Sequence, residues 1–292
     1  MAKQNNKNPL AGHFRTPRLY TGLPSGGTYY DDSIIDVTKD EHAVFSMTAK
    51  DELIMKNPDA LLNGDAVIQV IESCVPSVKD ASRLYSNDVD AILIAIQGAT
   101  FGDDIEVTAQ CDKCEKEVTQ ILSVEGVLTT MSVLKDSYEF TTESGLLIKL
   151  QPFSYRSAVR AGIANFRSAR SLQSITDIPD ELERVQAFSE NFLELAQLNF
   201  ELLVDSVSSI TIAGEEENTV VTDISQIREF LENCDRKIGD QISTFIEEIG
   251  KIGITRNMES SCDNEECVNS PEEPYVFESE VNFNPVNFFT AS

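Results

Sequence analysis

Two pairs of cysteines are the residues whose types and spacing could do chemistry in this chain. Cys111 and Cys114 are separated by two residues, the spacing of a zinc knuckle, in which a tight turn aims two thiolates at one ion. Cys262 and Cys267 are separated by four residues, which is looser but within the usual range for zinc ligands. Four thiolates would close a tetrahedral structural site and leave no position open for catalysis. We therefore predict one structural zinc ion as the cofactor, bound by both pairs and joining distant parts of the chain.

Other uses of these cysteines are weaker interpretations. Disulfides are disfavoured because the first residues show no apolar stretch of a signal peptide, so we expect a reducing compartment. A thioredoxin-like redox motif needs a strand before the pair and a helix after it, whereas residues 115–122 are typical of a returning strand. A knuckle that binds no metal stays open as an alternative. Cys74 and Cys234 stand alone on apolar helix faces and are expected to be small buried residues.

The composition argues against an enzyme. The chain has 292 residues, 41% of them hydrophobic, enough for one large domain or two modest ones, but only two histidines, His13 and His42. It contains no phosphate loop, no glycine-rich dinucleotide turn and no metalloprotease or serine-hydrolase motif. The longest uninterrupted apolar run, residues 91–96, is far too short to span a membrane. We therefore predict a non-enzymatic protein with no small-molecule substrate and no membrane partner.

The net charge of −26 is spread unevenly along the chain. Residues 1–30 carry four bases and no acid, whereas residues 31–200 and 201–292 each have a net charge of −15. So acidic a body repels nucleic acid, and no nucleic-acid partner is expected. Residues 1–33, rich in Asn, Pro, Gly and Thr, are predicted to form an extended basic arm. Its Arg15 and Arg18 would contact an acidic surface of this chain or of a neighbouring subunit; a solvated tail is the alternative.

Hydrophobic periodicity predicts an α+β fold, with a helical N-terminal core plus zinc-ribbon-like β hairpins and a mainly helical insertion. Helix-spaced apolar residues at 67–74 and 89–96 build the core, and alternation at 105–109 leads a strand into Cys111. We assign residues 34–124 and 254–292 to this core with its cysteine pairs, and residues 125–253 to the insertion. If zinc joins the two pairs, the insertion leaves and re-enters the ribbon at one place.

The insertion is predicted to contain two hairpins and several helices. The hairpins lie at 138–151, with a turn at 143–145, and at 210–221. A helix over about 154–172 precedes a longer one with Pro179 in its first turn and an end near Val204. Gly239 weakens the last helical stretch, which we expect to divide there. The longer helix carries an apolar stripe of Leu182, Val185, Phe188, Phe192, Leu195 and Leu202.

Two further features are candidates for binding a partner. Four arginines fall within roughly an 80° arc of one helix face; they are Arg156, Arg160, Arg167 and Arg170. They suit an acidic protein partner, or else they pair with acids of the following helix, which include Asp180, Glu181, Glu183, Glu190 and Glu194. Phe288 and Phe289 lie near the end of a polar chain, where they either pack on their own domain or bind a partner.

The order of these features resembles a known family. Residues 47–66 (Met-Thr-Ala-Lys-Asp-Glu-Leu-Ile-Met-Lys-Asn-Pro-Asp-Ala-Leu-Leu-Asn-Gly-Asp-Ala) are followed by Asp88-x-Asp90-Ala-Ile-Leu, Phe101-Gly102 and the Cys111 knuckle, and are preceded by Leu23-Pro-Ser-Gly-Gly. This stretch, roughly residues 19–125, is similar to the baseplate hub-assembly family of contractile-tailed, T-even type bacteriophages. The helical insertion matches only in general character.

The resemblance implies a non-enzymatic phage tail protein that builds the central hub of the baseplate or stays in it. Its partners would be other baseplate and tail hub proteins, and it would lie in the virion or, during tail assembly, in the host cytoplasm. The family pattern carries a knuckle at Cys111 and Cys114, while Cys262 and Cys267 come from spacing alone. Two other hypotheses are a zinc-ribbon regulatory protein that binds nucleic acid and a zinc hydrolase, which a fourth thiolate on the metal would exclude.

Overall fold

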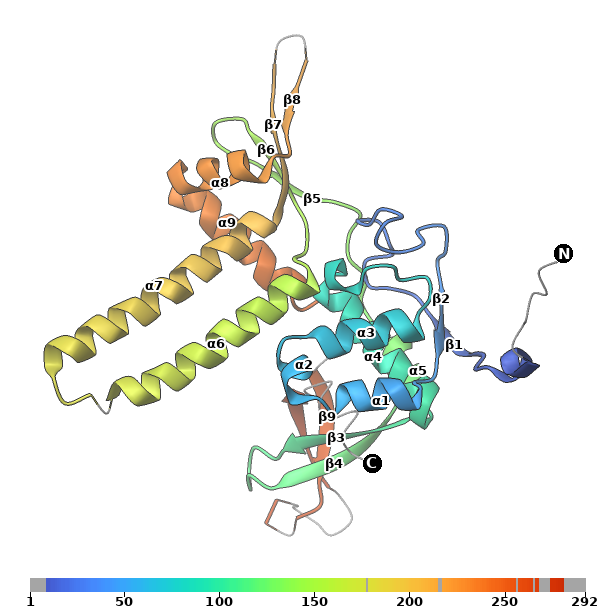
Figure 1. Cartoon of the computed structure of the whole chain (residues 1–292). Helices are drawn as coiled ribbons and strands as arrows, with labels where there is room; N and C mark the ends of the chain where they lie inside the picture. The colour runs from blue at the N-terminus through green and yellow to red at the C-terminus, as the bar shows by residue number, and fades with distance from the viewer. Residues whose placement is uncertain are drawn as a thin grey trace, which may run out of the picture.

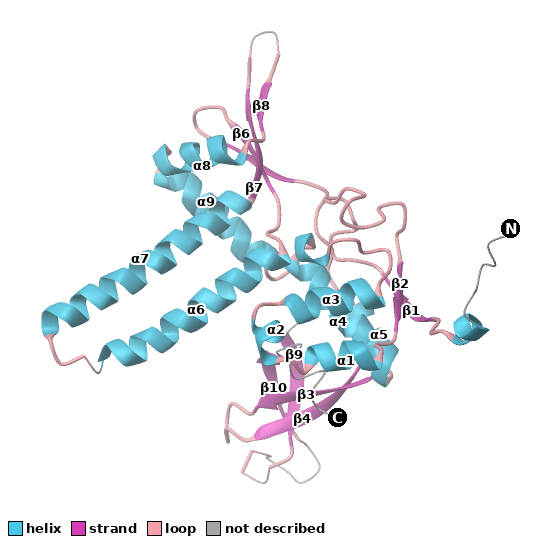
Figure 2. Cartoon of the chain, viewed as in Figure 1, coloured by secondary structure: helices cyan, strands magenta, loops and turns pink. Residues whose placement is uncertain are grey.

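The computed structural model describes residues 9–176, 178–214, 217–255, 257–264, 266–267 and 274–280 (Figure 1). Helices and four small antiparallel sheets make up this part of the chain, so the predicted α+β fold is confirmed (Figure 2). Within the described residues, no helix has both the length and the apolar character needed to cross a bilayer.

The N-terminal core is a set of four helices beside one small sheet. They are α1 (Ala49–Met55), α2 (Pro58–Leu62), α3 (Asp65–Cys74) and α4 (Ser86–Phe101), and the sheet pairs β1 (Pro17–Thr21) with β2 (His42–Phe45). Thr48 caps α1 with a reciprocal capping box to Asp51. The apolar positions of α3 predicted to face the core are buried, and α4 is buried around most of its circumference. Helix α4 is therefore the central element on which the neighbouring parts pack.

The predicted extended arm is shorter than 33 residues. A short 3-10 helix spans Pro9–His13, and β1 then pairs antiparallel with β2. Leu23 and Tyr30 are buried in the same cluster as the apolar residues of α3 and α4. Residues 17–33 thus belong to the core, because their few apolar side chains find partners far away in the sequence, which a local polar composition does not reveal.

Two hairpins form the ribbon at one end of the molecule. The first joins β3 (Asp104–Gln110) to β4 (Glu117–Ser123), and α5 (Val124–Thr129) follows it. The second joins β9 (Asn257–Cys262) to β10 (Tyr275–Glu280). Contacts of β4 with β9 and of β3 with β10 hold the hairpins side by side (Figure 1). Segments separated by the whole insertion, residues 125–253, therefore meet here.

After α5, the described part of the insertion contains an antiparallel sheet and four helices. The sheet has the order β5 (Tyr138–Thr141), β6 (Leu147–Leu150), β7 (Val207–Ile212) and β8 (Thr219–Val221). The helices are α6 (Tyr155–Thr176), α7 (Glu181–Asp205), α8 (Ile224–Asn233) and α9 (Arg236–Ile249). Both predicted hairpins are confirmed. The sheet packs with α8 and α9 around a cluster that includes Ile148, Ile210 and Ile242.

Two helix boundaries differ from the prediction. Helix α7 starts at Glu181 with Asp180 as its N-cap, so Pro179 precedes the cap instead of lying in the first turn. The last helical stretch divides between Cys234 and Asp235, not at Gly239, which lies inside α9. The physical reason is that the Asp235 side chain accepts a hydrogen bond from the backbone N–H of Lys237, and this cap starts a new helix.

The insertion is anchored at its base. Asn87, at the start of α4, donates from Nδ2 to the carbonyl oxygens of Ile249 (2.9 Å) and Ile252 (2.5 Å). Ser132 N donates to Gly253 O (2.8 Å), and Gly253 N donates back to Ser132 Oγ (2.9 Å). The two ends of the insertion are thereby tied to the core and to each other. The predicted domain limits at residues 124 and 253 stay a prediction.

Candidate metal centre

The first cysteine pair lies in the tight turn between β3 and β4. Cys111 N donates to Lys116 O (2.9 Å), and Glu115 N donates to Cys111 O (2.9 Å). Glu115 has a φ of 57°, in the left-handed region, and this reverses the chain directly after Cys114. The turn places both thiols at the tip of the hairpin, as a zinc knuckle requires.

The second pair lies at the connection between β9 and β10. Cys262 is the last residue of β9 and stands opposite Tyr275 in the strand register. Cys267 N donates to Asn264 O (2.8 Å), which turns the chain back within the loop. Both thiols are buried, although the loop between them is acidic and polar.

The two turns bring all four thiols into one cluster. The sulfurs of Cys111, Cys114, Cys262 and Cys267 all lie within 4.8 Å of one another. The Cys111–Cys267 and Cys114–Cys262 sulfurs are each 3.8 Å apart. These separations exclude disulfides, whose S–S bonds are about 2.05 Å. They match a tetrahedral zinc site, because Zn–S bonds of about 2.3 Å place neighbouring sulfurs about 3.8 Å apart.

The electrostatics of the cluster favour a cation. The Asn264 side chain, together with the backbone at Lys116, lowers the pKa of the Cys114 thiol to about 6, because donors stabilise the thiolate. Burial raises the pKa of Cys267 far above its ordinary value, and the neighbouring thiols add to this rise. A negative charge on Cys267 beside the other thiols is therefore disfavoured. A divalent cation bound to all four sulfurs would remove this penalty.

Two aromatic side chains that cysteine spacing does not reveal cover the cluster. Tyr275 and Phe277 of β10 stack with ring centroids 5.9 Å apart, and Phe277 is buried with the cysteines. Lys113 Nζ lies 3.6 Å from the centroid of the Tyr275 ring, and Tyr275 OH donates to Asp112 Oδ2 (3.2 Å). The cover therefore links the second hairpin to the knuckle. The alternation of Tyr275 and Phe277 after a cysteine pair is the sequence signal that could have identified it.

Comparison with known proteins places this chain in a family. The model of the T4 bacteriophage base plate protein family matches residues 23–273. The chain belongs to this family. Neither the curated proteins nor the solved structures contain a match to it. The predicted resemblance to baseplate proteins of T-even type phages is confirmed, and the match extends through the insertion.

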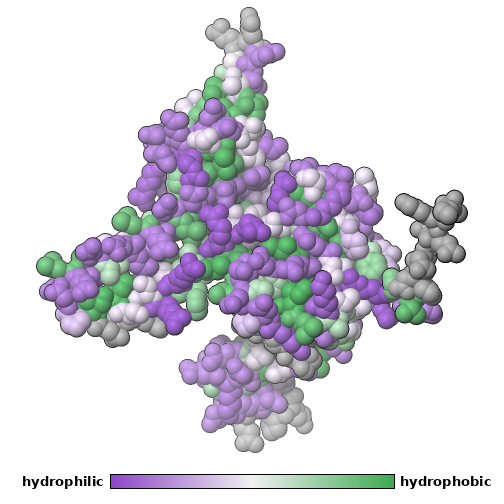
Figure 3. All heavy atoms as spheres, in the orientation of Figure 1, coloured by the Kyte–Doolittle hydropathy of each residue, from purple (hydrophilic) through white to green (hydrophobic). Residues whose placement is uncertain are grey.

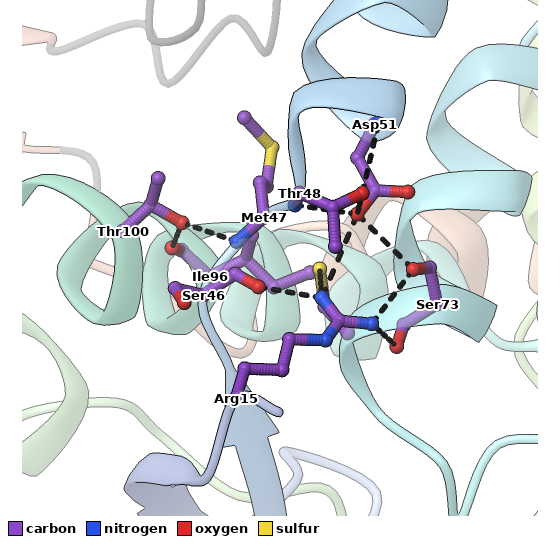
Figure 4. Close-up of polar contacts among 9 residues, drawn as sticks. Arg15, Ser46, Met47, Thr48, Asp51, Ser73, Ile96 and Thr100 are labelled. Carbon is purple, nitrogen blue, oxygen red and sulfur yellow. Dashed lines mark hydrogen bonds and ion pairs between the residues drawn. The ribbon is translucent and has the colours of Figure 1, made fainter. Parts of the chain in front are cut away.

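Arg15 of this baseplate protein is bound by its own chain (Figure 4). Its guanidinium donates to Ser46 O (2.5 Å) and Ser73 O (2.6 Å) and lies 3.5 Å from the Asp51 carboxylate. The side chain is only 28% exposed. Arg15 therefore joins the start of the chain to α1 and α3, and we leave it out of any surface for a partner. Arg18 lies exposed on β1 and stays a prediction.

The four predicted arginines, here called the arginine row, lie on α6. Arg156, Arg160, Arg167 and Arg170 are all exposed. The acids of α7 form no ion pair with them in the described structure, although the charge of Arg160 contributes to lowering the pKa of Glu201. The main cause of that low pKa is Arg228, whose guanidinium binds both carboxylate oxygens of Glu201. The predicted tail residues Phe288 and Phe289 lie outside the described residues.

Proposed function

We propose that this chain is a non-enzymatic structural or assembly component of the central hub of a contractile phage baseplate, stapled by one structural zinc ion. The observation that carries the proposal is the four-thiol cluster, which joins residues 111–114 to residues 262–267. Four thiolates fill a tetrahedral zinc shell, so the ion would hold the fold and activate no water. When bound, zinc supplies neutralisation of the thiolates and a rigid junction between the two hairpins.

Protein surfaces are then the means by which the chain acts. Membership of the baseplate family implies other baseplate proteins as partners. We propose that tail hub proteins are among them, that the chain acts in the virion baseplate or in the host cytoplasm during tail assembly, and that the ribbon presents the insertion in a fixed orientation.

A zinc-ribbon regulator that binds nucleic acid is the second candidate, and the exposed arginine row on α6 is the observation that favours it. The charge of the ribbon argues against it. Residues 104–123 and 257–280 together carry 13 acids and two bases, a net charge of −11. So negative a ribbon is repelled by a phosphate backbone. DNA binding that weakens steeply with salt, and is lost in an Arg160→Glu, Arg167→Glu double variant, would support this candidate over the hub.

The hub proposal is tested in a phage that encodes the chain. Deletion of the gene is expected to give tails without a complete baseplate in electron micrographs, and supplying the wild-type chain is expected to restore them. A Cys111→Ser, Cys114→Ser double variant should fail to restore them, whereas Cys234→Ser, a cysteine outside the cluster, should succeed. Mass spectrometry of purified particles then decides between a virion subunit and an assembly factor. Normal infectious particles in the absence of the chain would refute the proposal.

A further inference from the structure

The hairpin of α6 and α7 projects from the rest of the molecule (Figure 1). Its base is held by contacts of α6 with α4 and the 3-10 helix Ala81–Arg83, and of α7 with β7, α8 and α9. The connection between the two helices lies at the far end. Most of the length of α7 therefore has α6 on one side and solvent on the other.

The buried side chains of the two helices include small and polar ones. Ser157 and Ser168 of α6 and Asn191 of α7 are buried, and Asn191 Nδ2 donates to Ser168 O (3.4 Å). Val204 of α7 is buried and Leu195, Leu198 and Leu202 are half-buried. Five other large apolar side chains of α7 are exposed, and Figure 3 shows apolar surface at the outer end of the hairpin. They are Leu182 (82% exposed), Val185 (59%), Phe188 (54%), Phe192 (64%) and Leu193 (65%). A soluble hairpin that stayed alone would place these side chains inside, so this outward face requires a cover.

The outward face has the spacing of a helix–helix seam. Steps of three and four residues run along it through Leu182, Val185, Ser189, Phe192, Ala196, Asn199 and Leu203. All except the half-buried Leu203 are exposed. The small side chains at 189 and 196 allow a second helix to approach closely, and Phe188 and Leu193 flank the seam. None of these positions is charged.

We propose that two copies of this chain associate by packing the outward seams of their α7 helices together. Charge favours a second copy at this place. The hairpin, residues 155–205, carries five bases and eight acids, a net charge of −3, whereas the remaining residues account for −23 of the total of −26. Two such acidic chains approach each other with the least repulsion along the hairpin. An uncharged seam is also complementary to itself, as an interface with twofold symmetry requires.

The size of the seam predicts a weak dimer. Helix α7 has 25 residues and is therefore about 37 Å long. With a width of about 10 Å for one helix, the seam offers a face of about 370 Å². A standard stable interface buries about 800 Å² on each partner, so the pairing should dissociate readily on dilution. The proposed dimer interface contains no residue of the candidate metal centre. The dimer proposal can therefore be tested independently of the hub proposal.

The test is the mass of the full zinc-loaded chain in solution, measured by sedimentation equilibrium over a range of concentrations. We expect twice the chain mass of 32.3 kDa, with dissociation on dilution. Phe192→Asp and Leu193→Lys should each raise the dissociation constant by at least about tenfold. Both side chains are exposed in one chain, so helix content by circular dichroism and zinc content should stay unchanged.

Phe166→Asp is the matched control. Phe166 is 58% exposed on α6 of the same hairpin but lies outside the α7 seam, and its variant should remain a dimer. A chain that stays monomeric at every concentration would overturn the proposal. Binding of this monomer to a different baseplate protein through α7 would not rescue it. A dimer that survives both seam variants, or one that only Phe166→Asp disrupts, would overturn it equally.

Discussion

At the scale of single residues, the knuckle depends on the backbone of Glu115. Its φ of 57° is sparsely populated by residues with a Cβ and is worst for β-branched side chains. Glu115→Val should destabilise the zinc-loaded protein by about 1–2 kcal/mol and speed the loss of zinc to a chelator, whereas Glu115→Gly should not. Thermal unfolding and chelator competition measure both effects. Glu117→Val, in the adjacent strand β4, is the control. A Glu115→Val variant as stable as this control would contradict the left-handed backbone conformation of Glu115.

Asp88 gives the core a dependence on pH. Its carboxylate accepts hydrogen bonds from Ser25 N (2.8 Å) and from Tyr30 OH, which itself accepts from Tyr85 N (2.7 Å). Burial raises the pKa of Asp88 from 3.8 to about 6, although these hydrogen bonds oppose the rise. Between these two values the folded state binds more protons than the unfolded state. This contribution to stability is therefore present below about pH 4 and is lost as the pH rises to about 6.

Asp88→Asn removes this titration. Relative to the variant, the wild type should lose on the order of 2–3 kcal/mol of unfolding free energy between about pH 4 and pH 7. Urea unfolding at a series of pH values measures the difference between the two proteins, in which the contributions of other carboxylates cancel. A difference that is flat with pH, or that changes in the opposite direction, would show that Asp88 is not held in the buried state described.

The two cysteine pairs that cluster could be predicted as a candidate metal site, because cysteine spacing is a local signal. The partners of Arg15 and the aromatic cover of the cluster could not. Arg15 reaches Ser73, 58 positions away, and nothing near Arg15 in the sequence distinguishes it from the exposed Arg18. Contacts of this kind depend on how the helices pack, which is set by the whole core.

At the scale of elements, the junction of α4 with α5 depends on a glycine. A Cβ at Gly98 would lie 2.7 Å from a methyl group of Val124, the first residue of α5, whereas a Cβ at Gly239 in α9 would meet nothing within 4 Å. Gly98→Ala should cost about 1–3 kcal/mol through overpacking. Gly239→Ala should stabilise the protein by about 0.5–1 kcal/mol, since alanine favours a helix. Denaturant unfolding compares the two variants, and equal effects would contradict the packing described.

Helix α7 shows which features can be predicted from hydrophobic periodicity and which cannot. The apolar stripe predicted the helix, and the helix is there. The same pattern does not say what the stripe packs against, and four of its six residues are exposed: Leu182, Val185, Phe188 and Phe192. A period of 3.6 residues defines a face, while its partner is decided by tertiary and quaternary packing.

The helix boundary at Asp235 was not predicted, because the side-chain cap at Asp235 outweighed the weak helix propensity of Gly239.

At the scale of the whole molecule, zinc should support the ribbon and leave the N-terminal core independent. The cluster around the cysteines contains few other buried residues, chiefly Phe277, whereas the core around α3 and α4 is large and apolar. Removal of zinc with a chelator should therefore abolish hydrogen-exchange protection at the tips of β3, β4, β9 and β10 and preserve it in α4. Protection lost equally in α4, or retained in the ribbon, would contradict this division.

The central claim is that one zinc ion joins the two cysteine pairs and fixes both ends of the insertion at one place. Metal analysis and X-ray absorption of the intact protein, beside a Cys262→Ser variant, test it most directly. The account predicts one zinc per chain in a shell of four sulfurs at about 2.3 Å, and loss or weakening of zinc binding in the variant. A wild-type protein without zinc, or a zinc site that the Cys262→Ser change leaves untouched, would contradict it.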